Sequence, residues 1–167
     1  MRDSKLFDKA VAQFFEPIAR KLDLPLIKMN DGVYEIQSPY SIMRIRLDTG
    51  HRRGLNVLLR PASLREYDEN KPGEFGIVNF IEFNGEKLQQ TFFDVFTDED
   101  FLRQAQLLAQ AAERFGIPYL RGQKNDFEAI GEMIKKRGEP EQEKIREMMR
   151  NMPSFVREEW HIPTSDD

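Results

Sequence analysis

The 167-residue sequence predicts an α+β fold: an antiparallel sheet of about six strands, with an N-terminal helix and C-terminal helices packed on one face. Three observations predict it. Apolar residues recur every three or four positions near both ends of the chain, whereas apolar and polar residues alternate in the middle. Short turn sequences rich in glycine, asparagine and proline separate the alternating segments. We expect a single α+β domain over residues 1–163 and a disordered tail at 164–167.

The first expected element is a helix over residues 4–22 with one apolar stripe. Pro17 lies inside this helix, lacks a backbone N–H and crowds the carbonyl group one turn earlier. We therefore expect a kink near Gln13 or a break into two short helices. The dipeptide Leu24-Pro25 ends the element.

Three hairpins are expected next, because turn residues that tolerate positive φ stand between alternating segments. Their strand pairs are residues 26–29 with 33–37, 42–47 with 55–60, and 77–83 with 86–95. In the second hairpin the alternation pairs Leu47 with Leu55 and Ile45 with Val57. The third hairpin is expected because Asn84-Gly85 favours two-residue hairpin turns.

The clearest helix start lies at Thr97, whose side chain can cap the next turn while Asp100 stands three residues later. Phe96 and Phe101 occupy the positions of a hydrophobic staple around this cap. The apolar stripe that follows ends at Gly116, which we expect to be a left-handed cap before a proline.

Two further helices are expected over residues 126–137 and 140–149. Gly138 would end the first helix, and Pro140 would occupy the first position of the second. Residues 152–162 contain several apolar side chains among charges, so we expect that segment to pack against other residues. A capping-box pattern at Ser63 predicts one or two helical turns in the connection before residue 73.

The candidate binding surface is the second hairpin, since arginines gather there on the polar side of the strands. Residues 39–60 are rich in arginine, whereas residues 61–100 are rich in acids. The buried side of the hairpin is apolar, so the arginines are expected to project into water. The candidate residues are Arg44, Arg46, Asn56 and Arg60 on the strands and His51, Arg52 and Arg53 at the tip.

We expect a non-enzymatic protein-interaction module of the immunity, chaperone or adaptor type that binds an acidic or mixed-charge partner through this surface. Reversal of Arg44, Arg46 and Arg60 to glutamate is then expected to leave folding intact. A nucleic-acid or phosphate-binding protein that uses the same arginines and the tip is one alternative. A hydrolase centred on His51 is the other.

The amino-acid composition limits which kinds of site and cellular location are possible. The chain contains no cysteine and only two histidines, so thiolate metal sites and disulfides are excluded and no metal-ligand spacing is found. No cofactor is expected. No signal peptide or apolar run of membrane-spanning length is found, which predicts a cytoplasmic protein without a membrane partner.

Overall fold

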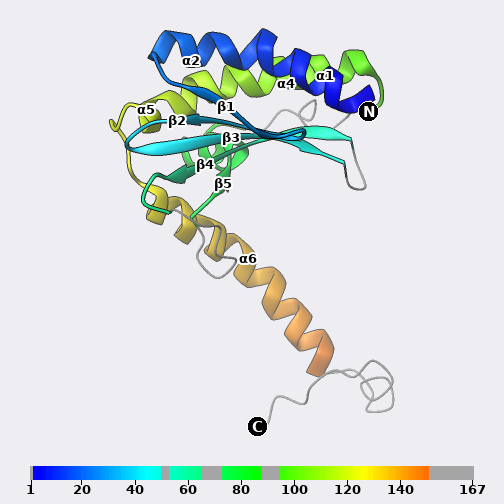
Figure 1. Cartoon of the computed structure of the whole chain (residues 1–167). Coiled ribbons are helices and arrows are strands. Elements are labelled where there is room, and N and C mark those ends of the chain that lie inside the picture. The colour runs from blue at the N-terminus through cyan, green and yellow to red at the C-terminus, as the bar shows by residue number, and fades with distance from the viewer. Residues whose placement is uncertain (1, 50–52, 65–72, 88–94, 151–167) are drawn as a thin grey trace. The chain divides into compact units, whose positions relative to one another are not determined.

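The computed structural model describes residues 2–49, 53–64, 73–87 and 95–150. It confirms the α+β class, with an antiparallel sheet preceded and followed by helices (Figure 1). The chain divides into two compact units, Met1–Gly131 and Glu132–Asp167. The first unit contains the whole described sheet. The single domain over 1–163 remains a prediction.

The described sheet has five strands in the order β1-β2-β3-β4-β5, and all neighbours are antiparallel. The strands are β1 (Leu26–Asn30), β2 (Val33–Gln37), β3 (Ser41–Asp48), β4 (Gly54–Pro61) and β5 (Phe75–Gly76). The first two expected hairpins are confirmed. The register of the second is also confirmed, because Leu47 pairs with Leu55 and Ile45 pairs with Val57.

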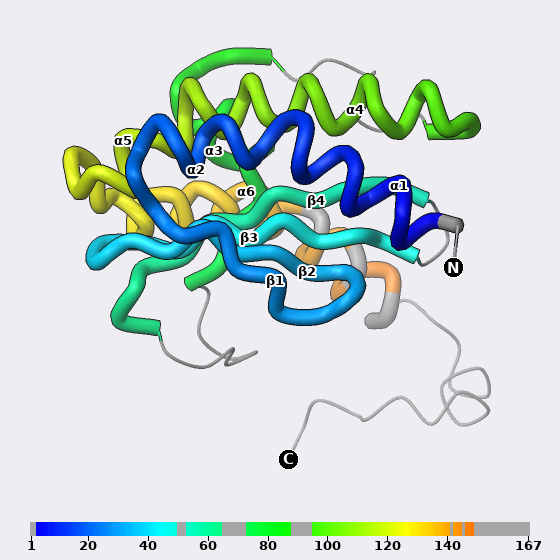
Figure 2. The backbone as a smooth tube through the Cα atoms, turned by 45° about the horizontal axis from the view of Figure 1, so that its top comes forward, coloured from blue at the N-terminus to red at the C-terminus, as the bar shows by residue number. Residues whose placement is uncertain are grey.

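Helices cover one face of this sheet, and they carry the main core. Figures 1 and 2 show α1 (Arg2–Ala10), α2 (Glu16–Leu22) and α4 (Asp98–Ala111) on the same side of the strands. The alternation of β3 and β4 places the apolar side chains of both strands toward these helices. The buried strand residues there are Ile36, Met43, Ile45, Leu55, Val57 and Leu59.

The helix does not break near Gln13, where a kink or a break was expected, but continues through a π turn. The turn η1 (Val11–Phe15) joins α1 to α2, and the N–H of Glu16 bonds the carbonyl of Val11. Pro17 then stands in the first turn of α2, where a missing N–H costs nothing. The wider turn carries the chain past the carbonyl that the proline ring would otherwise meet.

The expected helix start at Thr97 is confirmed as a capping box. The Thr97 side chain accepts from the N–H of Asp100, and the Asp100 carboxylate accepts from the N–H of Thr97. The expected hydrophobic staple is wrong, because Phe96 is 85% exposed while Phe101 is fully buried.

The expected helix end at Gly116 is wrong. A second π turn, η3 (Ala112–Gly116), follows α4, and the chain continues into α5 (Ile117–Leu120) with Pro118 in its first turn. Gly116 has φ −91°, so it is not a left-handed cap. Glycine permits a close approach instead: a Cβ atom there would lie 2.5 Å from Cε of Met43, the end of a flexible but fully buried side chain.

The first strand of the third expected hairpin is wrong, since residues 77–83 form the helix α3 (Ile77–Phe83). The Asn-Gly dipeptide ends this helix instead of closing a hairpin. Gly85 has φ 78°, its N–H bonds the carbonyl of Glu82, and the N–H of Glu86 bonds the carbonyl of Ile81. These are the two hydrogen bonds of a Schellman cap, which requires the same positive φ as a hairpin turn.

The two helices expected after residue 126 form one helix, α6 (Phe127–Arg150). Neither Gly138 nor Pro140 ends it. Lys136 and Pro140 are both exposed, so the carbonyl that loses its helical partner to the proline can bond water. The expectations for residues 65–72, 88–94 and 152–167 lie outside the described residues.

Gly116→Ala should destabilise the protein by about 1 kcal/mol, because the added methyl group displaces the fully buried end of Met43 and this cost exceeds the gain in helix propensity. The measurement is urea unfolding followed by circular dichroism. The same substitution in a Met43→Ala background, which lacks the Cε methyl, should cost clearly less. An equal cost in both backgrounds would mean that close approach to β3 is not what requires glycine.

Candidate functional site

The predicted arginines lie on the sheet face opposite the helix-covered core, which we call the arginine face. It carries Ile27, Glu35, Arg44, Arg46, Asn56, Leu58 and Arg60. The register places Arg44 between Glu35 of β2 and Leu58 of β4. It places Arg46 between Val33 and Asn56 in the same way. Neighbouring strands therefore bring acids and arginines side by side.

The centre of the arginine face is a buried ion cluster around Glu35, whose side chain is 1% exposed. One oxygen, Oε1, accepts from Nε and Nη2 of Arg44 at 3.0 and 2.8 Å and from Nη2 of Arg60 at 3.4 Å. The other oxygen accepts from Gln37 at 2.8 Å. Both lone-pair regions of the carboxylate are satisfied, as a buried charge requires.

The pKa of Glu35 lies below its ordinary value of 4.5. Burial by itself would raise this pKa, but hydrogen bonds from Gln37 and Arg44 and the positive charges of Arg44 and Arg60 outweigh burial. The carboxylate therefore stays ionised at neutral pH and is not a proton donor for catalysis.

A second acid completes the cluster. Glu74, whose side chain is 10% exposed, accepts from Nη1 of Arg44 at 3.2 Å. Arg60 is 9% exposed and donates through Nη1 to the carbonyl of Leu64 at 2.8 Å. Two carboxylates thus neutralise two guanidinium groups within the same chain.

The expectation that all these arginines project into water is therefore wrong for Arg44 and Arg60. Reversing either to glutamate would add a third acid to the cluster of Glu35 and Glu74, so the expected intact folding does not apply to them. Sequence reasoning missed the partner acids because it did not pair β2 with β3. Glu35 shares one side of its strand with Val33 and Gln37, and pairing that strand with β3 would have placed Glu35 beside Arg44.

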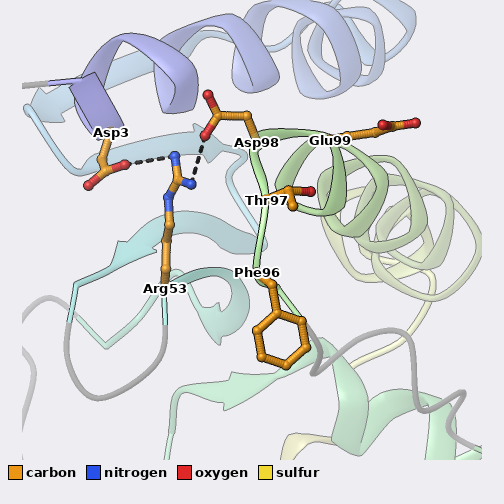
Figure 3. Close-up of a pocket in the computed structure, with 6 residues that line it drawn as sticks. All are labelled: Asp3, Arg53, Phe96, Thr97, Asp98 and Glu99. Atoms are coloured by element: carbon orange, nitrogen blue, oxygen red, sulfur yellow. Dashed lines mark hydrogen bonds and ion pairs between the residues drawn. The ribbon is translucent and has the colours of Figure 1, made fainter.

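Arg53 is also ion-paired with acids of the same chain. Figure 3 shows its guanidinium between Asp3 and Asp98, at 2.7 and 2.8 Å, and it lies 5.5 Å from the ring centre of Phe101. It thereby ties the residue before β4 to the first turns of α1 and α4, where negative charge is favourable. An open cavity of about 670 Å³ borders these groups, and Phe96 lines it.

Of the remaining candidates, Arg46 is exposed and no described residue forms an ion pair with it. Asn56 donates to Asp48 at 3.3 Å. His51 and Arg52 lie outside the described residues. The structure therefore brings Arg44, Arg46, Asn56 and Arg60 onto one face, and of these four residues Arg46 is the exposed cation.

Two exposed apolar residues extend the arginine face beyond the predicted set. Ile27 is 37% exposed and stands opposite Glu35, and Met29 is 52% exposed, two residues further along β1. Met29 is the extra residue of the register shift between Lys28 and Asn30, and its neighbour Asn30 pairs with Val33, which stands opposite Arg46, so we assign Met29 to this face as well. The alternation in residues 26–29 was the available signal, but it does not reveal which side is covered.

The described residues contain no group of three or more acids or histidines arranged to hold a metal ion.

The buried phenol of Tyr119 donates a hydrogen bond to the carboxylate of Asp126 at 2.5 Å. Burial, followed by this hydrogen bond and the charge of Asp126, raises the pKa of Tyr119. Tyr119 therefore stays protonated and orders the start of α6.

Within the described ranges, no helix has both the length and the apolar character that crossing a bilayer demands. Comparison with protein-family models, curated proteins and solved structures finds no match to this chain.

Glu35→Gln should destabilise the protein by about 3 kcal/mol, since it removes a buried charge that Arg44 shares and leaves the buried guanidinium of Arg60 without its carboxylate. Urea unfolding at pH 7 measures this. Glu16→Gln is the matched control, because Glu16 pairs with the exposed Arg20 on the surface of α2 and should change stability by less than about 1 kcal/mol.

The same pair of variants tests how the free energy of unfolding depends on pH. Because folding lowers the pKa of Glu35, its contribution to stability is complete above about pH 4.5 and is lost as the pH falls through the lower, folded-state pKa. Unfolding free energies measured between pH 7 and pH 3 should therefore fall less steeply in Glu35→Gln than in the native protein. Parallel pH profiles would contradict the assigned role of the carboxylate.

Proposed function

We propose that this chain is a non-enzymatic protein-interaction module, of the immunity, chaperone or adaptor type, that presents the arginine face to a protein partner. The observation that supports this most is the exposure of Ile27, Met29 and Arg46 together on one face of the sheet. Exposed apolar residues beside a cation are typical of protein-binding surfaces.

The ion cluster makes this surface suitable for docking. Arg44, Arg60 and Glu35 hold one another in fixed positions across three strands. A partner that binds here does not have to order those long side chains, which lowers the entropy lost on association. The apolar residues at the β1 side supply contact area, and Arg46 supplies one charged contact.

The charges favour a protein over a nucleic acid as the partner. Binding to a polyanion depends on several cations that contact phosphates. Among the described residues of this region, Arg44, Arg53 and Arg60 are each paired with acids of the same chain. One exposed arginine suits a single carboxylate of a mixed-charge protein better than a row of phosphates.

The test begins with a photo-crosslinking amino acid in place of Asn56, which neighbours Arg46 across β3 and β4. Crosslinking in the native cell, followed by mass spectrometry, should identify one protein repeatedly. The same amino acid in place of Arg20, an exposed residue of α2, should not capture that protein.

The identified partner is then titrated calorimetrically with purified variants. Arg46→Glu should weaken binding about tenfold or more, because it replaces an attractive charge by a repulsive one. Arg20→Glu makes the same charge change away from the arginine face and should leave the affinity unchanged. Equal affinities for both variants would reject the arginine face as the binding site.

A further inference from the structure

Strand β1 forms one edge of the described sheet, and its outer side is exposed. β1 pairs with β2 alone among the described strands. From Ile27 to Asn30 every residue is exposed. An exposed edge offers unpaired N–H and C=O groups to another strand.

The backbone geometry tells which groups of β1 point outward. The N–H of Gln37 bonds the carbonyl of Pro25, so these two residues form a hydrogen-bonded pair. In antiparallel ladders such pairs alternate with pairs that do not bond. Ile27 therefore directs its N–H and C=O toward β2, whereas Leu26 and Lys28 direct theirs toward the open edge.

We propose that β1 pairs with β1 of a second copy of this chain, antiparallel and about a two-fold axis at Lys28. Lys28 would then exchange its N–H and C=O bonds with Lys28 of the second copy. Ile27 would stand opposite Met29 of that copy, and Met29 opposite Ile27. The five-stranded sheets of both chains would continue into each other.

Side-chain chemistry favours a second copy as the occupant of this edge. The two-fold register brings Ile27 and Met29 of both chains into one apolar strip on the arginine face. Each exposed apolar residue then gains an apolar neighbour of the kind that stabilises paired strands. The sequence of β1 is thus complementary to itself.

The positive charge at the axis is already balanced. Nζ of Lys28 lies 3.1 Å from both carboxylate oxygens of Asp8 and 3.6 Å from Asp31. Two such groups meet as neutralised pairs rather than as bare cations. Because β1 is short and its register shifts between Lys28 and Asn30, we expect a weak dimer with a Kd on the order of micromolar.

This pairing deepens the proposed function and rests on the same sheet. It would join two arginine faces into one surface, with the apolar strip at the centre and one Arg46 on each side. A partner could then contact both chains at once, which raises its apparent affinity.

Site-specific disulfides test the register, because the chain has no cysteine of its own. Opposite residues that do not share hydrogen bonds have Cα atoms about 4.5 Å apart, within disulfide range. A mixture of Ile27→Cys and Met29→Cys chains should therefore crosslink about tenfold faster than either chain alone, since like positions lie diagonally, about 7 Å apart. Arg20→Cys chains, which carry an exposed cysteine away from β1, give the rate of crosslinking by random collision.

Sedimentation equilibrium of the full chain measures the association itself. The native chain should reach twice the monomer mass with increasing concentration, and Met29→Lys should raise the Kd about tenfold or more. Met148→Lys, at an exposed methionine of α6, should leave the Kd unchanged. A native chain that stays monomeric, or a mixture that crosslinks no faster than Arg20→Cys, would overturn the self-pairing.

Arg46→Glu separates the two proposals. It should weaken partner binding about tenfold or more and leave the dimer intact, because Arg46 does not lie on β1. Partner binding by a monomeric native chain would overturn the self-pairing alone. A dimer whose Asn56 crosslinker captures no defined protein would overturn the proposed function alone.

Discussion

The buried carboxylate of Glu35 is the constraint on which the arginine face depends. It lies between two guanidinium groups from the two following strands, and it keeps its charge because Arg44, Arg60 and Gln37 replace the water it has lost. If that charge were absent, Arg60 would be left with the neutral carbonyl of Leu64, and Arg44 would have Glu74 alone as its acidic partner among the described residues. The face is therefore rigid and neutral at its centre, and its free chemistry lies at its outer side.

On the other side of the sheet, close approach of helices imposes a different constraint. Both long helical segments near the core contain a proline, and both pass it through a π turn. Gly116 lets the second of these segments approach Met43 and Leu59. The helices can thus stay continuous along the sheet, and the strands keep their alternation between an apolar and a charged side.

These two sides explain why the candidate site differs from the set of arginines that the sequence suggested. Alternation correctly placed Arg44, Arg46, Asn56 and Arg60 on one face. Alternation within one hairpin does not show that Glu35 and Glu74, 9 and 30 residues away from Arg44, occupy the same face: Glu35 requires the pairing of β2 with β3, and Glu74 requires the tertiary structure. Exposure of Ile27 and Met29 likewise depends on which side the helices cover.

Local patterns in the sequence determined the α+β class, the first two hairpins, the irregularity near Pro17 and the capping box at Thr97, because each depends on neighbouring residues. Where one local pattern suited two different structures, tertiary packing decided between them. Gly85 needs positive φ in a hairpin turn and in a helix cap alike, so only packing of Ile77, Phe80 and Ile81 into the core selects the helix. Charge pairing between distant strands likewise decided which arginine remains exposed.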